Sequence, residues 1–466
     1  MAKEKTIFND VQALFDKLEP TYGHTFREYD INHRLDNPDN KGQLGHIVEE
    51  GILGYAINSN PEADIENLGI EIKVTGVIQN ENGSIKAKER LAIDAINYES
   101  VISGDFENSL MWTKAKKMLF VFYRYLEGKP YGDMPIIKAV LNEFDPIDIA
   151  IIKRDYEYIQ QMIEAGRAED ISEGDTMFLG ACTAGTGALV AQPFSNIKAK
   201  QRKFCLKQSY FSQLVRKYVS GEEYEHILNI EEAKKTTFEM AMEANLRPYY
   251  GMSEQAIRHK FEIKDNPKAK NRYERYLAAM LGIKGIVSDS DEFQKAGIKI
   301  KTIRIKENGK IKESMSFPYF EFTDIFIQDW PNSDVRNMFA TTKYMFVIFM
   351  ERKEGLFFDH IQFWHMTEFE LENYVRTAYE KLKKIIETGD IVASITKKAN
   401  GKIIRHTNFP GMSDNPLIHV RPHARDANDT CDLPVKDRLT GASTFTKQCF
   451  WLNSSFVEKI INPQNK

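Results

Sequence analysis

The sequence lacks the features that mark several large classes of protein. Its four cysteines, Cys182, Cys205, Cys431 and Cys449, are widely spaced and form no C-x-x-C pair, which argues against a zinc ribbon or a disulfide framework. No apolar run approaches the roughly 18 residues that span a bilayer. The first residues, Met-Ala-Lys-Glu-Lys, lack the apolar stretch of a signal peptide. We therefore expect a reduced, cytoplasmic protein with no membrane partner.

A strong excess of either charge is also absent. Lysine and arginine total 63 against 67 aspartates and glutamates, a net charge of −4, which excludes a uniformly basic nucleic-acid coat but not a local basic groove. A hydrophobic content of 42% and a charged content of 28% are those of a soluble globular protein. At 466 residues, the chain is long enough for two or three cores.

Short segments recur along the chain in the same order. Tyr22-Gly23 returns as Tyr250-Gly251, Leu53-Gly54 as Leu281-Gly282, and Gly69 as Gly297, all with one offset. The run from Met118 to Phe122 returns as Met345 to Phe349, one residue out of step. This repetition predicts two homologous halves. We place them at residues 1–218 and 235–466, joined by an acidic linker helix at 219–234.

Each half has the pattern of a mixed α/β domain. Apolar residues from Gly42 to Ile57 have helical spacing, whereas Ile70 to Val74 alternates apolar and charged residues as a strand does. The apolar run from Met118 to Tyr123 predicts a buried central strand, and Phe211 to Tyr218 predicts a helix.

The strongest chemical signal is a D-x6-E-x-K pattern formed by Asp64, Glu71 and Lys73. Gly69 permits a turn into the strand, whose alternation places Glu71 and Lys73 on one face within reach of Asp64. Two neighbouring carboxylates repel each other unless a cation lies between them, and oxygen ligands favour Mg²⁺. The alternative is an exposed amphipathic strand whose charges only face solvent.

The surrounding residues make this pattern more specific. The sequence resembles the catalytic segment of the MutH family, which comprises a mismatch-repair nicking enzyme and GATC-cutting type II restriction enzymes. The likeness is carried by Lys41-Gly42, Gly45, Glu50, Leu53-Gly54, Ser59, Pro61, Asp64, Leu68-Gly69, Glu71 and Lys73, and it continues through Lys114 and Phe204 to Lys207.

The resemblance implies a fold and a set of site residues. The fold would be mixed α+β, with two tandem PD-(D/E)xK nuclease domains in a pseudo-dimeric arrangement. Asp64 and Glu71 would be the metal ligands for Mg²⁺, with Lys73 as the motif lysine and Lys114 as a second lysine. The family's upstream helix glutamate falls on Glu50, with Glu49 as a neighbouring rival because the preceding glycine is one residue farther away than expected.

The second half departs from this pattern at the positions that matter for chemistry. Its residues at the places of Glu50, Asp64, Glu71, Lys73 and Lys114 are Ala278, Glu292, Lys299, Lys301 and Thr341. An ammonium in place of a metal-binding carboxylate should not hold Mg²⁺. We therefore predict a catalytically silent second half that retains a DNA-binding or regulatory role.

A basic segment in the first half is the expected DNA contact. Between Asn196 and Lys217 there is no acidic residue, and Lys198, Lys200, Arg202, Lys203 and Lys207 are candidates for phosphate contact. The resemblance also implies readout of GATC in this region. One departure is Cys205, which stands where the family's F-Y-L-K stretch has tyrosine.

These features favour a Mg²⁺-dependent type II restriction endonuclease that cuts double-stranded DNA at GATC. One site per chain would require either pairing of two chains on DNA or sequential nicking, and a companion DNA methyltransferase would protect the host. Two alternatives stay open at this point: a strand-nicking mismatch-repair enzyme and a non-cutting GATC-binding regulator.

Overall fold

A computed structural model describes residues 8–37, 42–55, 57, 63–185, 187–264, 266, 268–311, 314–399, 401 and 403–462. Lys41, Ser59 and Pro61 of the family-like segment lie outside the described residues. The chain forms two compact units. Unit 1 comprises Met1–Ala241 and Ile283–Gly297, and unit 2 comprises Met242–Gly282 and Ile298–Lys466. Both contain helices and strands, which confirms the mixed α/β class.

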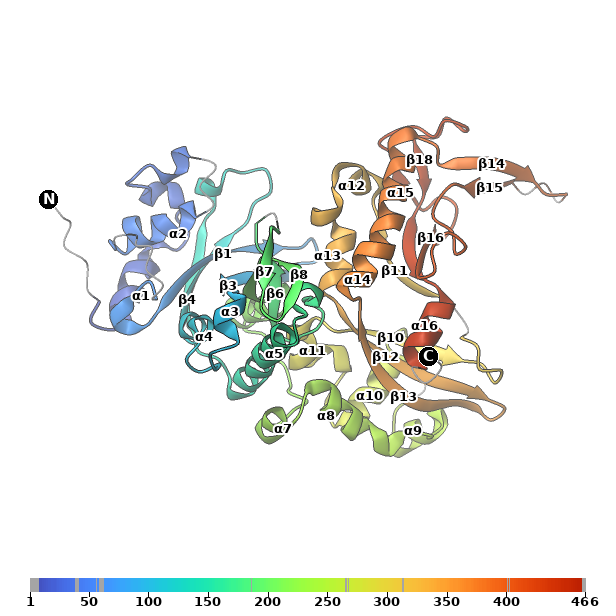
Figure 1. Ribbon diagram of the computed structural model, residues 1–466, viewed down its shortest axis with the longest axis horizontal. Coiled ribbons are helices and arrows are strands. Elements are labelled where there is room, and N and C mark those ends of the chain that lie inside the picture. The colour runs from blue at the N-terminus through green and yellow to red at the C-terminus, as the bar shows by residue number, and fades with distance from the viewer. Residues whose placement is uncertain are drawn as a thin grey trace. The chain divides into compact units, whose positions relative to one another are not determined.

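Unit 1 is built on a four-stranded sheet of order β2-β1-β4-β5, of which Figure 1 labels β1 and β4. Its strands are β1 (Glu71–Gln79), β2 (Ile85–Ala87), β4 (Met118–Arg124) and β5 (Ile136–Asn142). β1 and β4 are parallel, whereas β2 and β5 pair antiparallel at the two edges. Met118 to Tyr123 is buried throughout, which confirms the predicted central strand. Because β1 and β4 are parallel, both begin at the same edge of the sheet.

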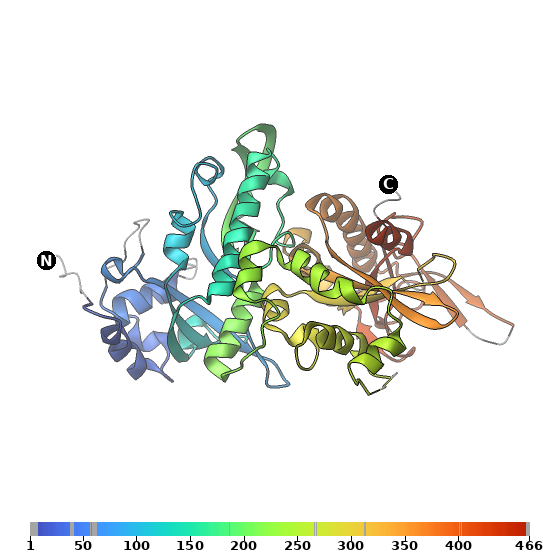
Figure 2. The same ribbon diagram turned by 90° about the horizontal axis from the view of Figure 1, so that it is seen from below.

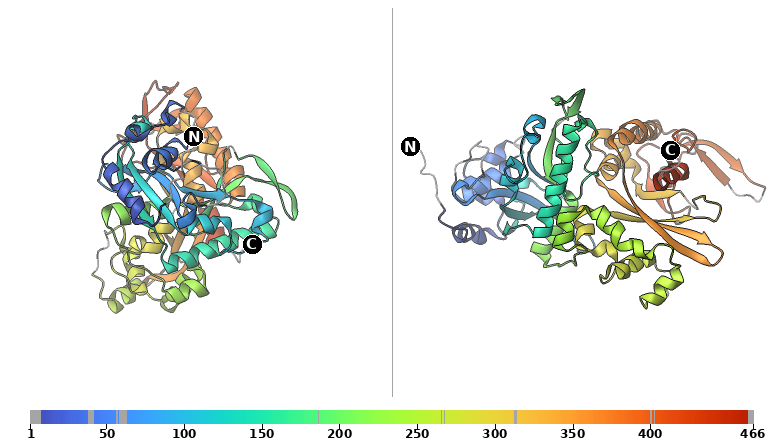
Figure 3. Two further views of the ribbon diagram at one scale, coloured as in Figure 1. Left: turned by 90° about the vertical axis from the view of Figure 1, so that its left-hand side faces the viewer. Right: turned by 60° about the horizontal axis from the view of Figure 1, so that its bottom comes forward.

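A second sheet and a hairpin complete the strands of unit 1. The second sheet has the order β3-β9-β6, with β3 (Leu91–Ala95), β6 (Leu179–Thr183) and the central strand β9 (Arg202–Leu206). β7 (Leu189–Gln192) and β8 (Ser195–Lys200) pair only with each other, and this hairpin projects from the unit (Figure 3, green).

The helices of unit 1 are mostly short. The longest is α5 (Pro146–Glu164), which Asp145 caps by accepting a hydrogen bond from the backbone N–H of Ile147 (Figure 2, teal). The others are α1 (Gln12–Leu18), α2 (Gln43–Ile47), α3 (Tyr98–Val101), α4 (Leu110–Ala115), α6 (Gln208–Val215), α7 (Ile230–Lys235) and α11 (Asp291–Ala296), with π-helical turns η4 (Val48–Ile52) and η8 (Arg216–Ser220). α8 (Phe238–Leu246) crosses the boundary between the units.

Unit 2 has a three-stranded sheet of order β10-β12-β13. β10 (Lys299–Ile305) is parallel to β12 (Lys343–Arg352), which pairs antiparallel with β13 (Gly355–His365). A second sheet has the order β11-β19-β16, formed by β11 (Met315–Phe320), β16 (Ile418–Pro422) and β19 (Gln448–Leu452). One apolar core extends through both sheets and the helices packed on them.

The remaining elements of unit 2 surround these sheets. Two hairpins are formed by β14 (Val392–Lys397) with β15 (Ile403–Thr407) and by β17 (Thr430–Asp432) with β18 (Thr444–Thr446). Its helices are α9 (Glu254–Lys260), α10 (Arg272–Leu281), α12 (Phe322–Ile327), α13 (Asp334–Thr341), α14 (Glu368–Glu370), α15 (Arg376–Thr388) and α16 (Ser454–Ile461), with a π-helical turn η12 (Leu371–Val375).

The units do not follow the expected boundaries throughout. The helical part of the expected linker is α7, which the Asn229 side chain caps and whose Ala233 carbonyl accepts a hydrogen bond from Arg154 of α5. The segment Ile283–Gly297, expected in the second half, packs as part of unit 1. There the Ser209 hydroxyl donates to the Lys295 carbonyl.

The sequence predicts neither a disulfide framework nor a membrane-spanning helix. All four cysteines are buried and free, so the chain carries no disulfide between them. Among the helices that the structure describes, none combines the length and the apolar character needed to cross a bilayer.

Candidate active site

A tight turn brings Asp64 beside the first strand. Ile65 and Ile70 exchange backbone hydrogen bonds of 2.9 and 3.3 Å around the 3₁₀ turn Glu66–Leu68. Gly69 closes that turn at a φ of 62°, a left-handed conformation that glycine adopts without strain. Asp64 therefore returns to β1, where its Oδ2 accepts a hydrogen bond of 2.8 Å from the backbone N–H of Ile72.

Glu71 and Lys73 lie together at the start of β1, as the alternation predicts. The Lys73 Nζ donates a hydrogen bond of 2.8 Å to Glu71 Oε1. Glu71 is only 7% exposed, so the alternative of a strand whose charges face solvent is wrong for this residue. The second carboxylate oxygen, Oε2, is buried and has no hydrogen-bond partner within the part of the chain that the structure describes. A buried, unpaired carboxylate oxygen is costly unless a ligand occupies the space beside it.

The two adjacent glutamates of the helical segment face different surroundings. Glu50 makes two hydrogen bonds with the Arg34 guanidinium, at 2.8 and 2.9 Å, which hold the pKa of its carboxyl below the ordinary value. Glu49 instead faces the carboxylates of Asp64 and Glu71. Burial, followed by the negative charges of Asp64, Glu50 and Glu71, raises the pKa of Glu49 to about 7.

The two glutamates are consecutive residues of the π-helical turn η4, so their side chains project in different directions. A π turn widens the helix by one residue relative to an α turn, and such turns are frequent at functional sites. The expected role of Glu50 stays a prediction, although its carboxylate is held by Arg34 and the geometry favours the neighbouring Glu49. Glu49 takes the place beside Asp64 and Glu71. The extra residue after the preceding glycine is the sequence signal for this shift.

Lys114 reaches the same edge of the sheet from α4, which leads into β4. Its Nζ donates a hydrogen bond of 3.0 Å to Asp94 Oδ1 on β3. Its positive charge also acts on Asp64, whose pKa is nonetheless raised by burial and by the charge of Glu71. The structure thus brings Asp64, Glu71, Lys73 and Lys114 together, and adds Glu49 and Asp94, which the motif does not contain.

The protein groups at this site supply only some of the ligands that a divalent cation needs. Within the described residues, no group of three or more His, Cys, Asp or Glu side chains could hold a metal ion by itself. The carboxylates of Asp64 and Glu71 are nevertheless present, and the Oε2 atom of Glu71 has no hydrogen-bond partner among the described residues. Mg²⁺ commonly binds through one or two carboxylates and takes its other oxygens from water and substrate phosphate. Asp64 and Glu71 match that requirement.

The expected DNA-binding segment is only partly on the surface. Lys198 and Lys203 are exposed, and Lys200 is half-buried. Arg202 and Lys207 are 3% and 2% exposed, respectively, which corrects their assignment as surface phosphate contacts. Arg202 is the first residue of β9 and donates to the Ala181 carbonyl of β6, whereas Lys207 follows β9 and donates to the Thr176 carbonyl. Lys203 on the same strand is exposed, so burial depends on how each side chain lies in the assembled sheet, which the sequence alone does not reveal.

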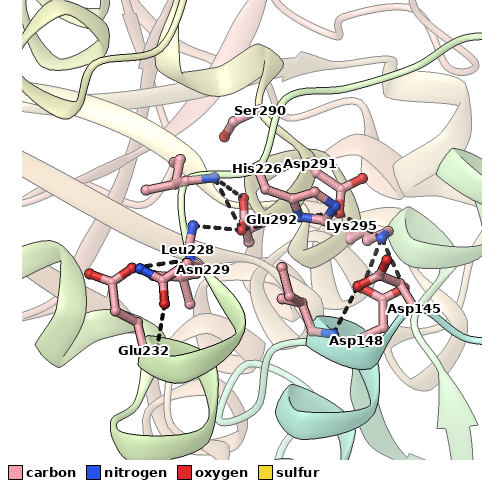
Figure 4. Close-up of polar contacts among 12 residues, drawn as sticks. Asp145, Asp148, His226, Leu228, Asn229, Glu232, Ser290, Asp291, Glu292 and Lys295 are labelled. Carbon is pink, nitrogen blue, oxygen red and sulfur yellow. Dashed lines mark hydrogen bonds and ion pairs between the residues drawn. The ribbon is translucent and has the colours of Figure 1, made fainter.

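The counterpart of the acidic turn in the second half has become structural. Glu292 of α11 is fully buried and accepts hydrogen bonds from the backbone N–H groups of Ile227 and Leu228 (Figure 4). His226 lies 3.4 Å from both Glu292 and Asp291, and Lys295 bridges Asp291 and Asp148 at 2.5 and 2.8 Å. The carboxylates of this cluster are thus engaged by protein groups. Lys299, at the place of Glu71, is exposed on β10.

Comparison of the sequence with known proteins identifies the family of this chain. The family model described as DNA mismatch repair enzyme MutH matches residues 53–155 of the sequence. This range includes Asp64, Glu71, Lys73 and Lys114. The chain is 27% identical to the DNA mismatch repair protein MutH of Shewanella baltica strain OS195 over 192 residues, covering 40% of this chain and 84% of that protein.

A second relative matches far more of the chain. The type II restriction enzyme Sau3AI of Staphylococcus aureus is 31% identical over 484 aligned residues, which cover 97% of this chain and 98% of that enzyme. The chain therefore belongs to the MutH family, and it shares nearly its whole length with the restriction enzyme Sau3AI.

Proposed function

We propose that this protein is a Mg²⁺-dependent type II restriction endonuclease that hydrolyses phosphodiester bonds of double-stranded DNA at GATC sites. The observation that carries the proposal is the buried Glu71 carboxylate. One of its oxygens accepts a hydrogen bond from Lys73, the other has no hydrogen-bond partner among the described residues, and its charge acts on Asp64. End-to-end similarity to a restriction enzyme supports the same function.

We also propose that the two units are copies of one nuclease fold. In each, the first strand runs parallel to a central strand that pairs antiparallel with the next. The pairing differs by one residue, since Lys73 lies opposite Phe120 and Lys301 lies opposite Phe346, whereas the sequence repetition relates Phe120 to Val347. A tandem, pseudo-dimeric arrangement of two MutH-like domains accounts for the shared strand arrangement.

In the cutting site, each side chain has a separate task. Asp64 and Glu71 would hold the Mg²⁺ ion, and a bound Mg²⁺ would polarise a phosphoryl oxygen and stabilise charge on the leaving oxygen. Lys73, already held at the site by Glu71, can orient the attacking water and neutralise charge on the phosphorus. Lys114 adds a second positive charge at the same edge, and Glu49 can accept a proton close to neutral pH.

Unit 2 would bind DNA without cutting it. Ala278, Glu292, Lys299 and Thr341 replace the groups that the chemistry needs, so one chain carries one cutting site. Breaking both strands then requires either two chains paired on DNA or two successive nicks. A DNA methyltransferase acting on the same site would be its functional companion. Among the expected surface contacts, Lys198, Lys200 and Lys203 of unit 1 are the groups available to DNA phosphates.

Digestion of plasmid DNA tests the proposal. Wild-type protein, Glu71→Ala and a control variant, Glu81→Gln, would be incubated with Mg²⁺ and unmethylated supercoiled plasmids with and without GATC. Glu81 is exposed in the turn after β1, so its variant should behave as wild type. We expect linear fragments from wild type and Glu81→Gln on the GATC plasmid only.

Other outcomes separate the alternatives. Nicked circles that persist without linear product would favour a strand-nicking enzyme, and retarded but intact plasmid would favour a non-cutting binder. The order in which nicked and linear plasmid appear also distinguishes successive nicking from cutting by paired chains. A nicked intermediate whose yield is independent of protein concentration indicates successive nicking, whereas linear product that rises steeply with concentration indicates paired chains.

A further inference from the structure

Unit 2 contains a basic pocket near the place that corresponds to the cutting site of unit 1. The pocket has a volume of about 450 Å³ and lies between the start of α10, β10 and β11. Its charged and polar lining includes Lys268, Lys270, Arg272, Lys301, Arg304 and Ser316. None of the described residues that line it is acidic.

Lys301 is the central cation of this pocket. It stands in the sequence repeat at the place of Lys73, but the residue at the place of Glu71 has become Lys299. Its Nζ donates a hydrogen bond of 2.8 Å to the Ser316 carbonyl and lies 5.4 Å from the centre of the Phe317 ring. Among the described residues, no carboxylate forms an ion pair with Lys301, whose pKa is lowered by burial. A half-buried ammonium in this situation gains from an anion in the adjacent space.

The other cations of the pocket differ in whether a carboxylate of the protein pairs with them. Arg272 pairs with Glu254, so its charge is largely compensated within the unit. Lys268 and Lys270 are exposed at the pocket and lead into α10, where Asn271 provides no side-chain cap for the first backbone N–H groups. Positive side chains beside an uncapped helix start form a setting that suits a phosphate group.

We propose that this pocket binds a phosphate group of intact duplex DNA, with Lys301 at its base and Lys268 and Lys270 at its mouth. The inference rests on the proposed function, because it identifies where unit 2 would contact DNA. Where unit 1 has the carboxylate of Glu71 before Lys73, unit 2 has Lys299 before Lys301. Unit 2 thereby binds the phosphate directly and lacks the means to cut it. A free polyphosphate has the same chemistry and is the competing source.

Binding measurements on the full chain in EDTA test this inference. Fluorescence anisotropy with a labelled duplex containing GATC would compare wild type, Lys301→Met, Lys268→Gln/Lys270→Gln, and the control Lys384→Ala/Lys436→Ala. The control removes two exposed lysines of unit 2 that do not line the pocket. We expect about tenfold weaker binding in both pocket variants, and a slope of log K against log salt that is shallower by about one for each phosphate left unbound. The control should bind as wild type does.

Two further measurements separate a binding role from a structural role and identify the source of the phosphate. Lys301→Met should unfold at the same temperature as wild type or higher, because it removes a half-buried charge with no carboxylate partner. Pyrophosphate would be titrated calorimetrically into the same proteins. Tight, Lys301-dependent binding of pyrophosphate with unchanged DNA affinity would retain the phosphate site and assign it to a free polyphosphate.

Unchanged affinity for both probes in the pocket variants would overturn the inference. Plasmid cleavage by wild type, measured alongside, keeps this result apart from the proposed function. If wild type cuts GATC plasmid while the pocket variants bind normally, only the inference about the pocket fails. If wild type does not cut but binding depends on Lys301, the proposed cutting activity fails and the phosphate site stands.

Discussion

Two adjacent glutamates show how much the surroundings of a side chain decide its chemistry. Glu50 is fixed by the Arg34 guanidinium, which lowers the pKa of its carboxyl, whereas Glu49 is half-buried near the carboxylates of Asp64 and Glu71, and its pKa is raised to about 7. The first is equipped for a structural ion pair. The second is equipped to hold or release a proton, or to respond to a cation at Asp64 and Glu71.

Substitution of each glutamate should therefore have a different effect. Glu49→Gln removes negative charge from the cutting site and should lower Mg²⁺ affinity and cleavage rate by about 10- to 100-fold. Glu50→Gln breaks a partly exposed ion pair and should lower the free energy of unfolding by about 1 kcal/mol, with a smaller effect on cleavage at saturating Mg²⁺. Plasmid cleavage over a range of Mg²⁺ concentrations would measure both, and the reverse order of effects would refute the assignment of Glu49.

The sequence predicts part of this site from local rules. Alternation along the strand is enough to put Glu71 and Lys73 on one face, and Gly69 correctly marks the turn that returns Asp64 to it. The choice between Glu49 and Glu50 depends on a π turn, which leaves only an ambiguous one-residue shift in spacing. The burial of Arg202 and Lys207 depends on how each side chain lies in a sheet assembled from distant segments.

At the scale of elements, η4 fits against its neighbour only because residue 51 is glycine. A Cβ atom at Gly51 would lie 1.9 Å from the Tyr29 carbonyl oxygen. Gly51→Ala should therefore displace η4 and Glu49, lower the free energy of unfolding by about 1–3 kcal/mol, and reduce cleavage. Gly104→Ala after α3 is the control, because its Cβ would have its nearest neighbour, the Ser100 carbonyl oxygen, at 3.7 Å. Thermal unfolding and plasmid cleavage of both variants would test this, and equal behaviour would contradict it.

The buried cluster of α11 should make the stability of unit 1 depend on pH. Contact with Glu292 raises the pKa of His226 above its ordinary value of 6.5, despite the opposing effect of burial. The folded state thus binds this proton more tightly than the unfolded state, so the stabilising contribution is present below pH 6.5 and is lost as the pH rises through the folded pKa. Burial also raises the pKa of Asp291, which gives a slope of the same sign at lower pH.

Denaturant unfolding at several pH values would detect this dependence. Between pH 6.5 and 8, the free energy of unfolding should fall more for wild type than for His226→Ala. His33→Asn serves as the control, since His33 is exposed and asparagine tolerates its left-handed backbone conformation at a φ of 54°. A wild-type slope no steeper than that of His226→Ala in this range would contradict the assignment of His226.

At the scale of the whole molecule, the two units combine a similar strand arrangement with a reversal of charge at one aligned position, where Glu71 of unit 1 is replaced by Lys299. Unit 1 places carboxylates and lysines at the edge where β1 and β4 begin, whereas unit 2 has Lys299 and Lys301 at the start of β10. Internal repetition in the sequence predicts the shared arrangement. It does not predict that Ile283–Gly297 packs with unit 1, because that depends on buried contacts such as Lys295 with Asp148.

Cutting should depend on the carboxylates of unit 1 and not on the corresponding positions of unit 2. The rate at which GATC plasmid becomes linear, measured for Glu71→Gln and Lys299→Gln side by side, tests this dependence. We expect Glu71→Gln to slow cleavage by about 10²–10³-fold or more, and Lys299→Gln to stay within a few-fold of wild type. Near-normal cleavage by Glu71→Gln, or loss of cleavage in Lys299→Gln alone, would show that unit 1 does not carry the cutting site.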